Sequence, residues 1–142
     1  MNTARKPHVL VVEDDSIVRQ TVCNTLEREG YTVVAVESAA AALAELKGTT
    51  RFDLVFSDVV MPGVMSGIEL IREVQHQWPA TKVLLTSGYP DDRASIRMSD
   101  GIRLVSNPAK FKRPEGVPLL AKSYSNAALK KALADLLGPT GP

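Results

Sequence analysis

The sequence predicts an α/β protein built on a parallel sheet with helices on both faces. Along the 142 residues, short apolar runs alternate with stretches whose apolar positions recur at helical spacing. The apolar runs are almost uninterrupted, which is typical of strands that are covered on both sides. Five such strand–helix units with mostly short connections indicate a parallel sheet rather than an antiparallel one.

The first half of the chain contains three predicted strands separated by two helices. Each strand is a run of mainly β-branched and other apolar residues, and each helix ends near a glycine. The first helix has Asp15 or Ser16 as its N-cap, and the second has Ser38. In chain order we predict a strand at 8–12, a helix at 16–29, a strand at 32–36, a helix at 38–47 and a strand at 52–57.

The second half of the chain continues the alternation of strands and helices, with a break between the fourth and fifth strands. Trp78-Pro79 ends one helix, because the residue before a proline is pushed out of the helical region. Pro118 indicates an edge position for the fifth strand, since proline cannot donate a hydrogen bond within a sheet. Ser125 caps the last helix. These elements are predicted as a helix at 67–77, a strand at 82–86, a strand at 117–121 and a helix at 125–137.

The segment between the fourth and fifth strands, residues 88–116, has the weakest pattern. It mixes prolines, aspartates and lysines. A helix over residues 92–99 is compatible with the sequence, and the rest is predicted as an extended loop. Loops of this length are usually functional or poorly ordered. We interpret its basic part, at 110–113, as solvated loop rather than as a contact with a partner.

Size and composition exclude several classes of protein. We predict one domain over residues 1–142 with a core at about 8–138, because domains commonly have this length. The net charge of +1 gives no overall attraction to nucleic acid or anionic membrane, and no apolar run approaches a bilayer span. Cys23, the single cysteine, excludes an internal disulfide and is expected as an inert core thiol. A cytoplasmic domain is therefore expected.

Polar side chains follow four of the five predicted strands. In an open parallel sheet, ligands bind beyond the carboxyl ends of the strands, so these side chains are expected to converge. In chain order they are Glu13, Asp14 and Asp15 after the first strand, Asp58 after the third, Thr86 and Ser87 after the fourth, and Lys122 after the fifth.

This set of side chains limits the chemistry of the site. Crowded carboxylates repel one another unless a cation neutralises them, and a few oxygen ligands suit Mg²⁺. The sequence has no cluster of His and Cys that would favour zinc or copper. A carboxylate beside Mg²⁺ and a lysine is suited to act as a nucleophile in phosphoryl transfer, because both cations offset charge on the transferring group. Asp58 is the candidate nucleophile.

Four segments resemble response regulator receiver domains, the phosphoryl-accepting modules of two-component phosphorelay signal transduction. The similarity extends from about residue 9 to residue 137. The motifs MPGVMSG and LTSGY are most similar to those of receivers in hybrid sensor histidine kinases. The resemblance implies a flavodoxin-like (βα)5 three-layer sandwich with strand order 2-1-3-4-5. The segments are VLVVEDD at 9–15, DVVMPG at 58–63, VLLTSGY at 83–89 and LAKSYS at 120–125.

The resemblance also implies roles for the acidic residues. Asp58 matches the aspartate that accepts a phosphoryl group from a histidine kinase or a histidine phosphotransfer protein, forming an aspartyl phosphate. Glu13 and Asp14 match the acidic pair that holds Mg²⁺, with Asp14 as the direct ligand. Asp58 itself and the backbone carbonyl of Val60 complete the expected ligand set. Asp15 falls one position later and is assigned to capping the helix.

The remaining matches concern the phosphoryl group. Thr86 matches the hydroxyl residue that moves towards it, Ser87 the small residue beside it, and Lys122 the lysine that contacts its oxygens. A receiver of this kind is not a conventional enzyme, since it catalyses only its own Mg²⁺-dependent phosphorylation and dephosphorylation. We expect no direct contact with nucleic acid or membrane.

Three features depart from the family pattern. Ser123 follows Lys122 where most members have a proline, commonly in a cis peptide. A cis bond before a non-proline residue costs about 2.5–4 kcal/mol, so a trans or strained bond is expected. Leu119 occupies the position of an aromatic residue whose rotamer follows the hydroxyl residue. The segment 88–116 is longer than usual, and in the family this surface reports phosphorylation to partners.

Alternative functions stay open at this point. A receiver-like adaptor that acts by protein interaction without phosphorylation would account for Ser123 and Leu119. A phosphatase of the haloacid type would need a second aspartate two residues after the first, where this chain has Val60. The protein is either a stand-alone receiver or one cut from a larger kinase. A homodimer through the region after the fourth strand is also possible.

Overall fold

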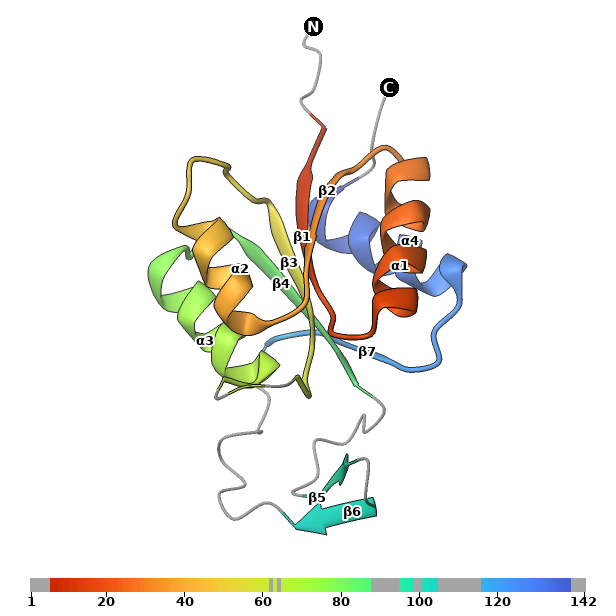
Figure 1. The fold of residues 1–142 in the computed structure, drawn as a ribbon. Coiled ribbons are helices and arrows are strands. Elements are labelled where there is room, and N and C mark those ends of the chain that lie inside the picture. The colour runs from red at the N-terminus through yellow and green to blue at the C-terminus, as the bar shows by residue number, and fades with distance from the viewer. Residues whose placement is uncertain are drawn as a thin grey trace, which may run out of the picture.

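The central element of the fold is a five-stranded parallel sheet with the order β2-β1-β3-β4-β7 (Figure 1). The structure, a computed structural model, describes residues 6–61, 63, 65–87, 95–98, 101–104 and 116–138. With β7 as the fifth strand of the sheet, the order confirms the predicted 2-1-3-4-5 arrangement. The strands are β1 (His8–Val12), β2 (Thr32–Val36), β3 (Leu54–Asp58), β4 (Lys82–Ser87) and β7 (Leu119–Ala121).

Helices cover both faces of this sheet, as Figure 1 shows. Two of them, α2 and α3, lie on one face, and α1 and α4 lie on the other. The three-layer prediction is therefore confirmed. The helices are α1 (Ser16–Arg28), α2 (Ala39–Leu46), α3 (Gly67–Gln77) and α4 (Asn126–Leu137).

The core has two parts because successive residues of a strand point to opposite faces. In β1, Leu10 and Val12 belong to the cluster beneath α2 and α3, while Val9 and Val11 belong to the cluster beneath α1 and α4. All four side chains are at most 1% exposed. A strand buried on both faces needs apolar residues at every position, which explains the uninterrupted run in the sequence.

Side-chain caps fix where the helices begin. The carboxylate of Asp15 accepts hydrogen bonds from the backbone of Ile17 and Val18, so Asp15 is the N-cap of α1. Ser38 and Ser125 cap α2 and α4 as predicted. These caps place the loops that precede the helices at the carboxyl edge of the sheet.

The fifth strand of the sheet is shorter than predicted. It spans only Leu119–Ala121, and Pro118 lies just before it. The carbonyl of Pro118 accepts a hydrogen bond from Leu85 of β4 at 3.1 Å. Because β7 pairs only with β4 in this sheet, the predicted edge position is confirmed.

The helix considered for residues 92–99 is wrong where the structure describes this segment. β5 (Ser95–Met98) and β6 (Gly101–Leu104) form an antiparallel two-stranded sheet. Two short runs of alternating polar and apolar residues, with Asp100-Gly101 where the second run begins, are typical of a β-hairpin, a signal that the helix prediction overlooked. The remainder of 88–116 lies outside the described residues, apart from Gly116.

None of the helices in the described part of the chain has the length and apolar character needed to cross a bilayer.

Candidate functional site

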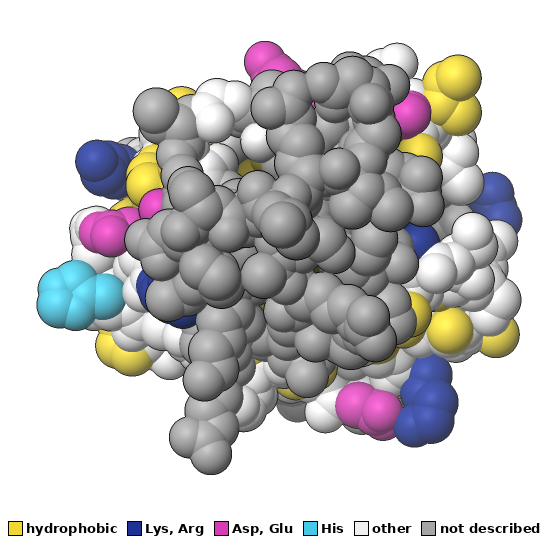
Figure 2. All heavy atoms as spheres, turned by 90° about the horizontal axis from the view of Figure 1, so that it is seen from below, with side chains coloured by type: hydrophobic (Ala, Val, Ile, Leu, Met, Phe, Trp, Pro, Cys, Tyr) yellow, Lys and Arg dark blue, Asp and Glu magenta, His cyan; other side chains and the backbone are white. Residues whose placement is uncertain are grey.

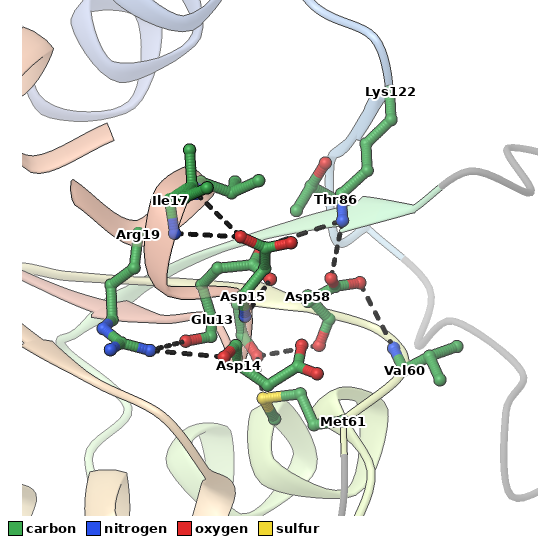
Figure 3. Close-up of polar contacts among 12 residues, drawn as sticks. Glu13, Asp14, Asp15, Ile17, Arg19, Asp58, Val60, Met61, Thr86 and Lys122 are labelled. Atoms are coloured by element: carbon green, nitrogen blue, oxygen red, sulfur yellow. Dashed lines mark hydrogen bonds and ion pairs between the residues drawn. The ribbon is translucent and has the colours of Figure 1, made fainter. Parts of the chain in front are cut away.

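The predicted site residues meet at the carboxyl edge of the sheet (Figure 3). Asp58 is the last residue of β3, and Thr86 is its register partner on β4. Both side chains are buried, with Asp58 7% and Thr86 2% exposed. A buried carboxylate at a strand end is unusual, because an ionised group needs compensating partners away from water.

Three carboxylates form the acidic part of the site. Oxygen atoms of Glu13, Asp14 and Asp58 all lie within 4.8 Å of one another. Glu13 and Asp58 are buried, whereas Asp14 is exposed. A small cluster of carboxylate oxygens that is open to solvent on one side suits Mg²⁺, which retains several water ligands. The donor set therefore fits the predicted ion.

The fourth predicted ligand is the backbone carbonyl of Val60, two residues after Asp58 in the chain. Its backbone N–H donates to Oδ1 of Asp58 at 3.3 Å, so the turn after β3 folds back on the carboxylate. Figure 3 shows Val60 on the side of Asp58 that faces away from Glu13.

Lys122 supplies the positive charge at the site. Its Nζ atom lies 2.7 Å from Oδ2 of Asp58 and 3.7 Å from Oε1 of Glu13. Its backbone N–H donates to the carbonyl of Ser87 at 2.9 Å, which attaches the end of β7 to β4. The lysine side chain is 33% exposed, so solvent reaches part of this ion pair.

The peptide bond between Lys122 and Ser123 is cis. The expectation was a trans or strained bond, and the trans alternative is wrong. It considered only the local cost of a non-proline cis peptide and not the tertiary contacts of Lys122. The lysine reaches Asp58 without the proline that usually follows it in the family pattern.

Burial and charge shift the proton equilibria of the site. Burial raises the pKa of Glu13 to about 7, and the charge of Asp58 adds to this effect, while the N–H of Asp15 opposes it. Burial also raises the pKa of Asp58, although the hydrogen bond from Lys122 opposes the shift. Burial lowers the pKa of Lys122, but its contact with Asp58 outweighs this and raises it overall. The cluster therefore favours binding a proton or a cation.

The hydroxyl of Thr86 points away from the carboxylates. It donates a 2.8 Å hydrogen bond to the carbonyl of Leu120 on β7. Ser87, the neighbouring residue on β4, is 3% exposed and lies at the same edge. The structure thus brings Thr86 close to Asp58 in the sheet, while its hydroxyl is engaged with the edge strand.

Arg19 is a site residue that the sequence argument missed. Its Nη1 atom donates to the carbonyls of Glu13 and Asp14, at 2.8 and 3.4 Å. The guanidinium therefore holds the backbone of the two adjacent acidic residues. Its position four residues after the N-cap Asp15 was the available signal, since residues spaced in this way share one face of a helix.

Asp15 is placed as predicted for a cap and not as part of the acidic cluster. Besides capping α1, its backbone N–H donates to Oε2 of Glu13 at 3.1 Å. The loop from Glu13 to Asp15 is therefore held by its own hydrogen bonds before any ion binds.

A cavity of about 270 Å³ lies beside this site, between α1 and the connection from β7 to α4. Its lining includes Ile17, Val22, Lys122, Tyr124 and Leu129. Ile17, in the first turn of α1, is 77% exposed. The ring of Tyr124 packs edge-on against Phe56.

Comparison with known proteins identifies the family and supports the fold. The model of the response regulator receiver domain matches residues 9–105, about two thirds of the chain. The chain belongs to the response regulator receiver family. In receiver domains an acidic pocket binds Mg²⁺, and histidine kinases supply the phosphoryl group. Glu13, Asp14 and Asp58 form an acidic cluster in the described part of this chain.

Curated relatives of the receiver include regulators and a kinase. The response regulator FleR of Pseudomonas aeruginosa is 44% identical over 94 residues, which cover 66% of this chain and 20% of FleR. The sensor kinase CckA of Brucella abortus is 42% identical over 87 residues, which cover 59% of this chain and 9% of CckA. The receiver therefore spans only a small part of these relatives.

Solved receiver structures match nearly the whole chain. The signal receiver domain of an HD domain-containing protein from Pseudomonas fluorescens has a TM-score of 0.74 at 26% identity, covering 94% of this chain and 95% of that one. Chemotaxis response regulator CheY4 of Vibrio cholerae has a TM-score of 0.72 at 29% identity, covering 94% and 100%. The response regulator TrrA of Thermotoga maritima, in complex with Mg²⁺-BeF, has a TM-score of 0.70 at 26% identity, covering 92% and 99%.

Proposed function

We propose that this receiver is a phosphorylation switch in which Asp58 accepts a phosphoryl group from a phosphohistidine donor in the presence of Mg²⁺. The observation that carries the proposal is the placement of Lys122 Nζ 2.7 Å from Asp58 Oδ2, beside an acidic cluster within 4.8 Å. This arrangement supports the proposal, because a carboxylate that could act as a nucleophile lies beside an ammonium group and beside further oxygen donors suited to Mg²⁺.

The transfer step balances without any further reactant. A carboxylate oxygen of Asp58 forms a bond to phosphorus, the bond from phosphorus to the donor's imidazole nitrogen breaks, and the imidazole leaves with that electron pair. Bound Mg²⁺ would offset the charge of the phosphoryl oxygens. We assign its binding to Glu13, Asp14, Asp58 and the backbone carbonyl of Val60.

Lys122 has two roles in this proposal. Before transfer it pairs with Asp58 and keeps the buried carboxylate from being an isolated charge. After transfer its ammonium group pairs with a negatively charged phosphoryl oxygen instead of the carboxylate. The same charge-assisted contact therefore serves both states of the switch.

Thr86 provides the response to phosphorylation. We propose that its hydroxyl leaves the carbonyl of Leu120 and donates to the phosphoryl group, with Ser87 beside it leaving room for that group. The carbonyl of Leu120 on β7 then loses a 2.8 Å hydrogen bond. Because Leu119 is not aromatic, the change passes to β7 through this main-chain contact. Phosphorylation shifts the balance between two states of the surface around β4 and β7.

The donor is a protein, either a histidine kinase or a histidine phosphotransfer protein. Asp58 is only 7% exposed, so the donor has to bind against the surrounding surface to bring its histidine close enough. The exposed Ile17 and the cavity beside Lys122 offer an apolar contact next to the site. Figure 2 shows the molecule from the carboxyl edge of the sheet, where the described side chains around the rim carry charges of both signs.

The proposal treats residues 1–142 as one receiver domain in the cytoplasm. It acts as a signalling module and not as a conventional turnover enzyme. A homodimer through the region after β4 stays a prediction, since most of residues 88–116 lie outside the described part of the chain.

The test is to add acetyl phosphate, or beryllofluoride as its analogue, together with Mg²⁺. The wild type should change conformation, and Asp58→Asn should not. An unchanged response in Asp58→Asn would overturn the proposal. A wild type that shows no Mg²⁺ binding in a calorimetric titration would favour the adaptor that acts without phosphorylation.

A further inference from the structure

The main-chain carbonyl of Asp58 has supporting contacts of its own. The carbonyl oxygen of Asp58 accepts a 2.9 Å hydrogen bond from the hydroxyl of Ser57. Ser57 is 1% exposed, so this bond is shielded from water. A buried hydroxyl with a defined acceptor fixes the orientation of the peptide that follows Asp58.

The first residue of α3 lies directly against the same carbonyl. A Cβ atom on Gly67 would lie 1.8 Å from the carbonyl oxygen of Asp58, 2.8 Å from its carbonyl carbon and 3.0 Å from Oγ of Ser57. Gly67 is a helical residue without a positive φ, so glycine is required here by space and not by backbone conformation. Glycine is unfavourable in a helix, which makes this close approach informative.

Backbone hydrogen bonds extend this support to the turn after β3. The N–H of Gly67 donates to the carbonyl of Val59 at 2.8 Å, and the N–H of Val59 donates to the carbonyl of Thr86 at 2.9 Å. The next residue, Val60, donates its N–H to Oδ1 of Asp58 at 3.3 Å. Residues 58–60 are thus fixed between the start of α3 and the end of β4.

We propose that Ser57 and Gly67 are positioning residues for phosphoryl transfer. Together they hold the backbone of Asp58 to Val60, which carries two of the proposed Mg²⁺ ligands, the carboxylate of Asp58 and the carbonyl of Val60. Neither touches the reacting atoms, and both act through the main chain of the acceptor. This inference rests on the proposed function of Asp58 as the phosphoryl acceptor.

A methyl group at Gly67 would force α3 and the acceptor apart by roughly 1.5 Å, since ordinary contact begins near 3.4 Å. A displacement of about 1 Å at a reacting group can lower a rate about 100-fold. We therefore expect Gly67→Ala to slow labelling by acetyl phosphate about 10- to 100-fold and to weaken Mg²⁺ binding. Ser57→Ala removes one hydrogen bond and should slow labelling about 3- to 10-fold.

The control is Gly48→Ala, at the end of α2 and away from the site. A Cβ atom there would meet only backbone oxygens of its own helix, the closer one, that of Glu45, at 3.3 Å. All variants are compared at a temperature at which circular dichroism shows them folded. The readouts are the labelling rate with acetyl phosphate and the dissociation constant of Mg²⁺ from calorimetry. Under these conditions a purely structural role would lower the melting temperature and leave both readouts unchanged.

Wild-type values of both readouts in folded Gly67→Ala and Ser57→Ala would overturn the inference. If Gly67→Ala does not fold, Ser57→Ala alone decides. A wild type that neither binds Mg²⁺ nor becomes labelled would instead defeat the proposed function, and this inference with it. The expected result is normal labelling in the wild type and in Gly48→Ala, with slower labelling and weaker Mg²⁺ binding in the two positioning variants.

Discussion

Lys122 reaches past β4 to bind Asp58. The two residues lie 64 positions apart, at the ends of β7 and β3, which are not neighbours in the sheet. The ion pair joins the end of β7 to the end of β3 at a distance of 2.7 Å. It ties the edge strand to the proposed acceptor. A change in the charge of Asp58 therefore acts directly on Lys122, at the start of the connection between β7 and α4.

Replacing Lys122 by methionine should lower stability and slow phosphorylation. Lys122→Met keeps the aliphatic stem and removes the ammonium group, which leaves Asp58 and Glu13 as buried acids without their cation. Because the lysine is one-third exposed, the expected loss in the free energy of unfolding is about 1–2 kcal/mol. Urea unfolding at neutral pH measures it. Lys131→Met, which breaks the exposed pair with Asp135, is the control and should leave stability unchanged.

Stability without Mg²⁺ should fall between about pH 5 and about pH 8. The pKa of Glu13 is raised from 4.5 in the unfolded chain to about 7 in the folded one, with burial as the main cause. The folded state therefore binds more protons across this interval. The stabilisation is complete below pH 4.5 and is lost as the pH rises through about 7.

Melting temperatures across this range, with and without Mg²⁺, test that prediction. Glu13→Gln should flatten the pH dependence, because the neutral amide does not titrate. Saturating Mg²⁺ should reduce the dependence in the wild type, since the ion replaces the proton as the compensating charge. The same steep dependence in Glu13→Gln would contradict the assignment.

The backbone around Leu120 should respond to phosphorylation through the hydroxyl of Thr86. Thr86→Val retains the shape of the side chain and removes the hydroxyl, at an expected cost of about 0.5–1.5 kcal/mol in stability. Acetyl phosphate should still label Asp58 in this variant. The amide NMR signals of β7 should respond much less to beryllofluoride than in the wild type. Thr86→Ser keeps the hydroxyl and should retain most of the response, and equal responses in Thr86→Val and the wild type would exclude this route.

Arg19 should contribute to Mg²⁺ affinity without binding the ion. Its guanidinium holds the carbonyls of Glu13 and Asp14, which fixes the backbone from which both carboxylates project. Arg19→Ala is expected to weaken Mg²⁺ binding about 10-fold, within the range found for residues that orient metal ligands. Calorimetric titration measures the dissociation constant. Arg28→Ala, at the other end of the same helix, is the matched control and should bind as the wild type does.

The sequence pattern was sufficient for a parallel sheet and for the edge where its polar residues meet, while the strand order came from the resemblance to receiver domains. Parallel strands end at one edge, so the polar residues after four strands had to meet there, and Asp58, Thr86 and Lys122 do so. The caps Asp15 and Ser38 were predictable because their hydrogen bonds are local. What could be read in advance depended on short-range rules and on the direction of the strands.

The features that sequence reasoning missed depend on long-range contacts. The bond from Thr86 to Leu120 and the approach of Gly67 to Asp58 each join parts of the chain that no local pattern relates. The cis peptide after Lys122 was not predicted either. The hairpin of β5 and β6 is different, since Asp100-Gly101 was a local signal that the helix prediction did not use.

The most direct test of the central claim is intact-mass spectrometry after incubation with acetyl phosphate, in the wild type and in Asp58→Asn. We predict that the wild type gains the mass of one phosphoryl group when Mg²⁺ is present, and gains nothing when EDTA is present from the start of the incubation. Asp58→Asn, shown to be folded by circular dichroism, should gain nothing. Labelling of Asp58→Asn at the wild-type level, or no labelling of a wild type that binds Mg²⁺, would contradict the assignment of Asp58 as the acceptor.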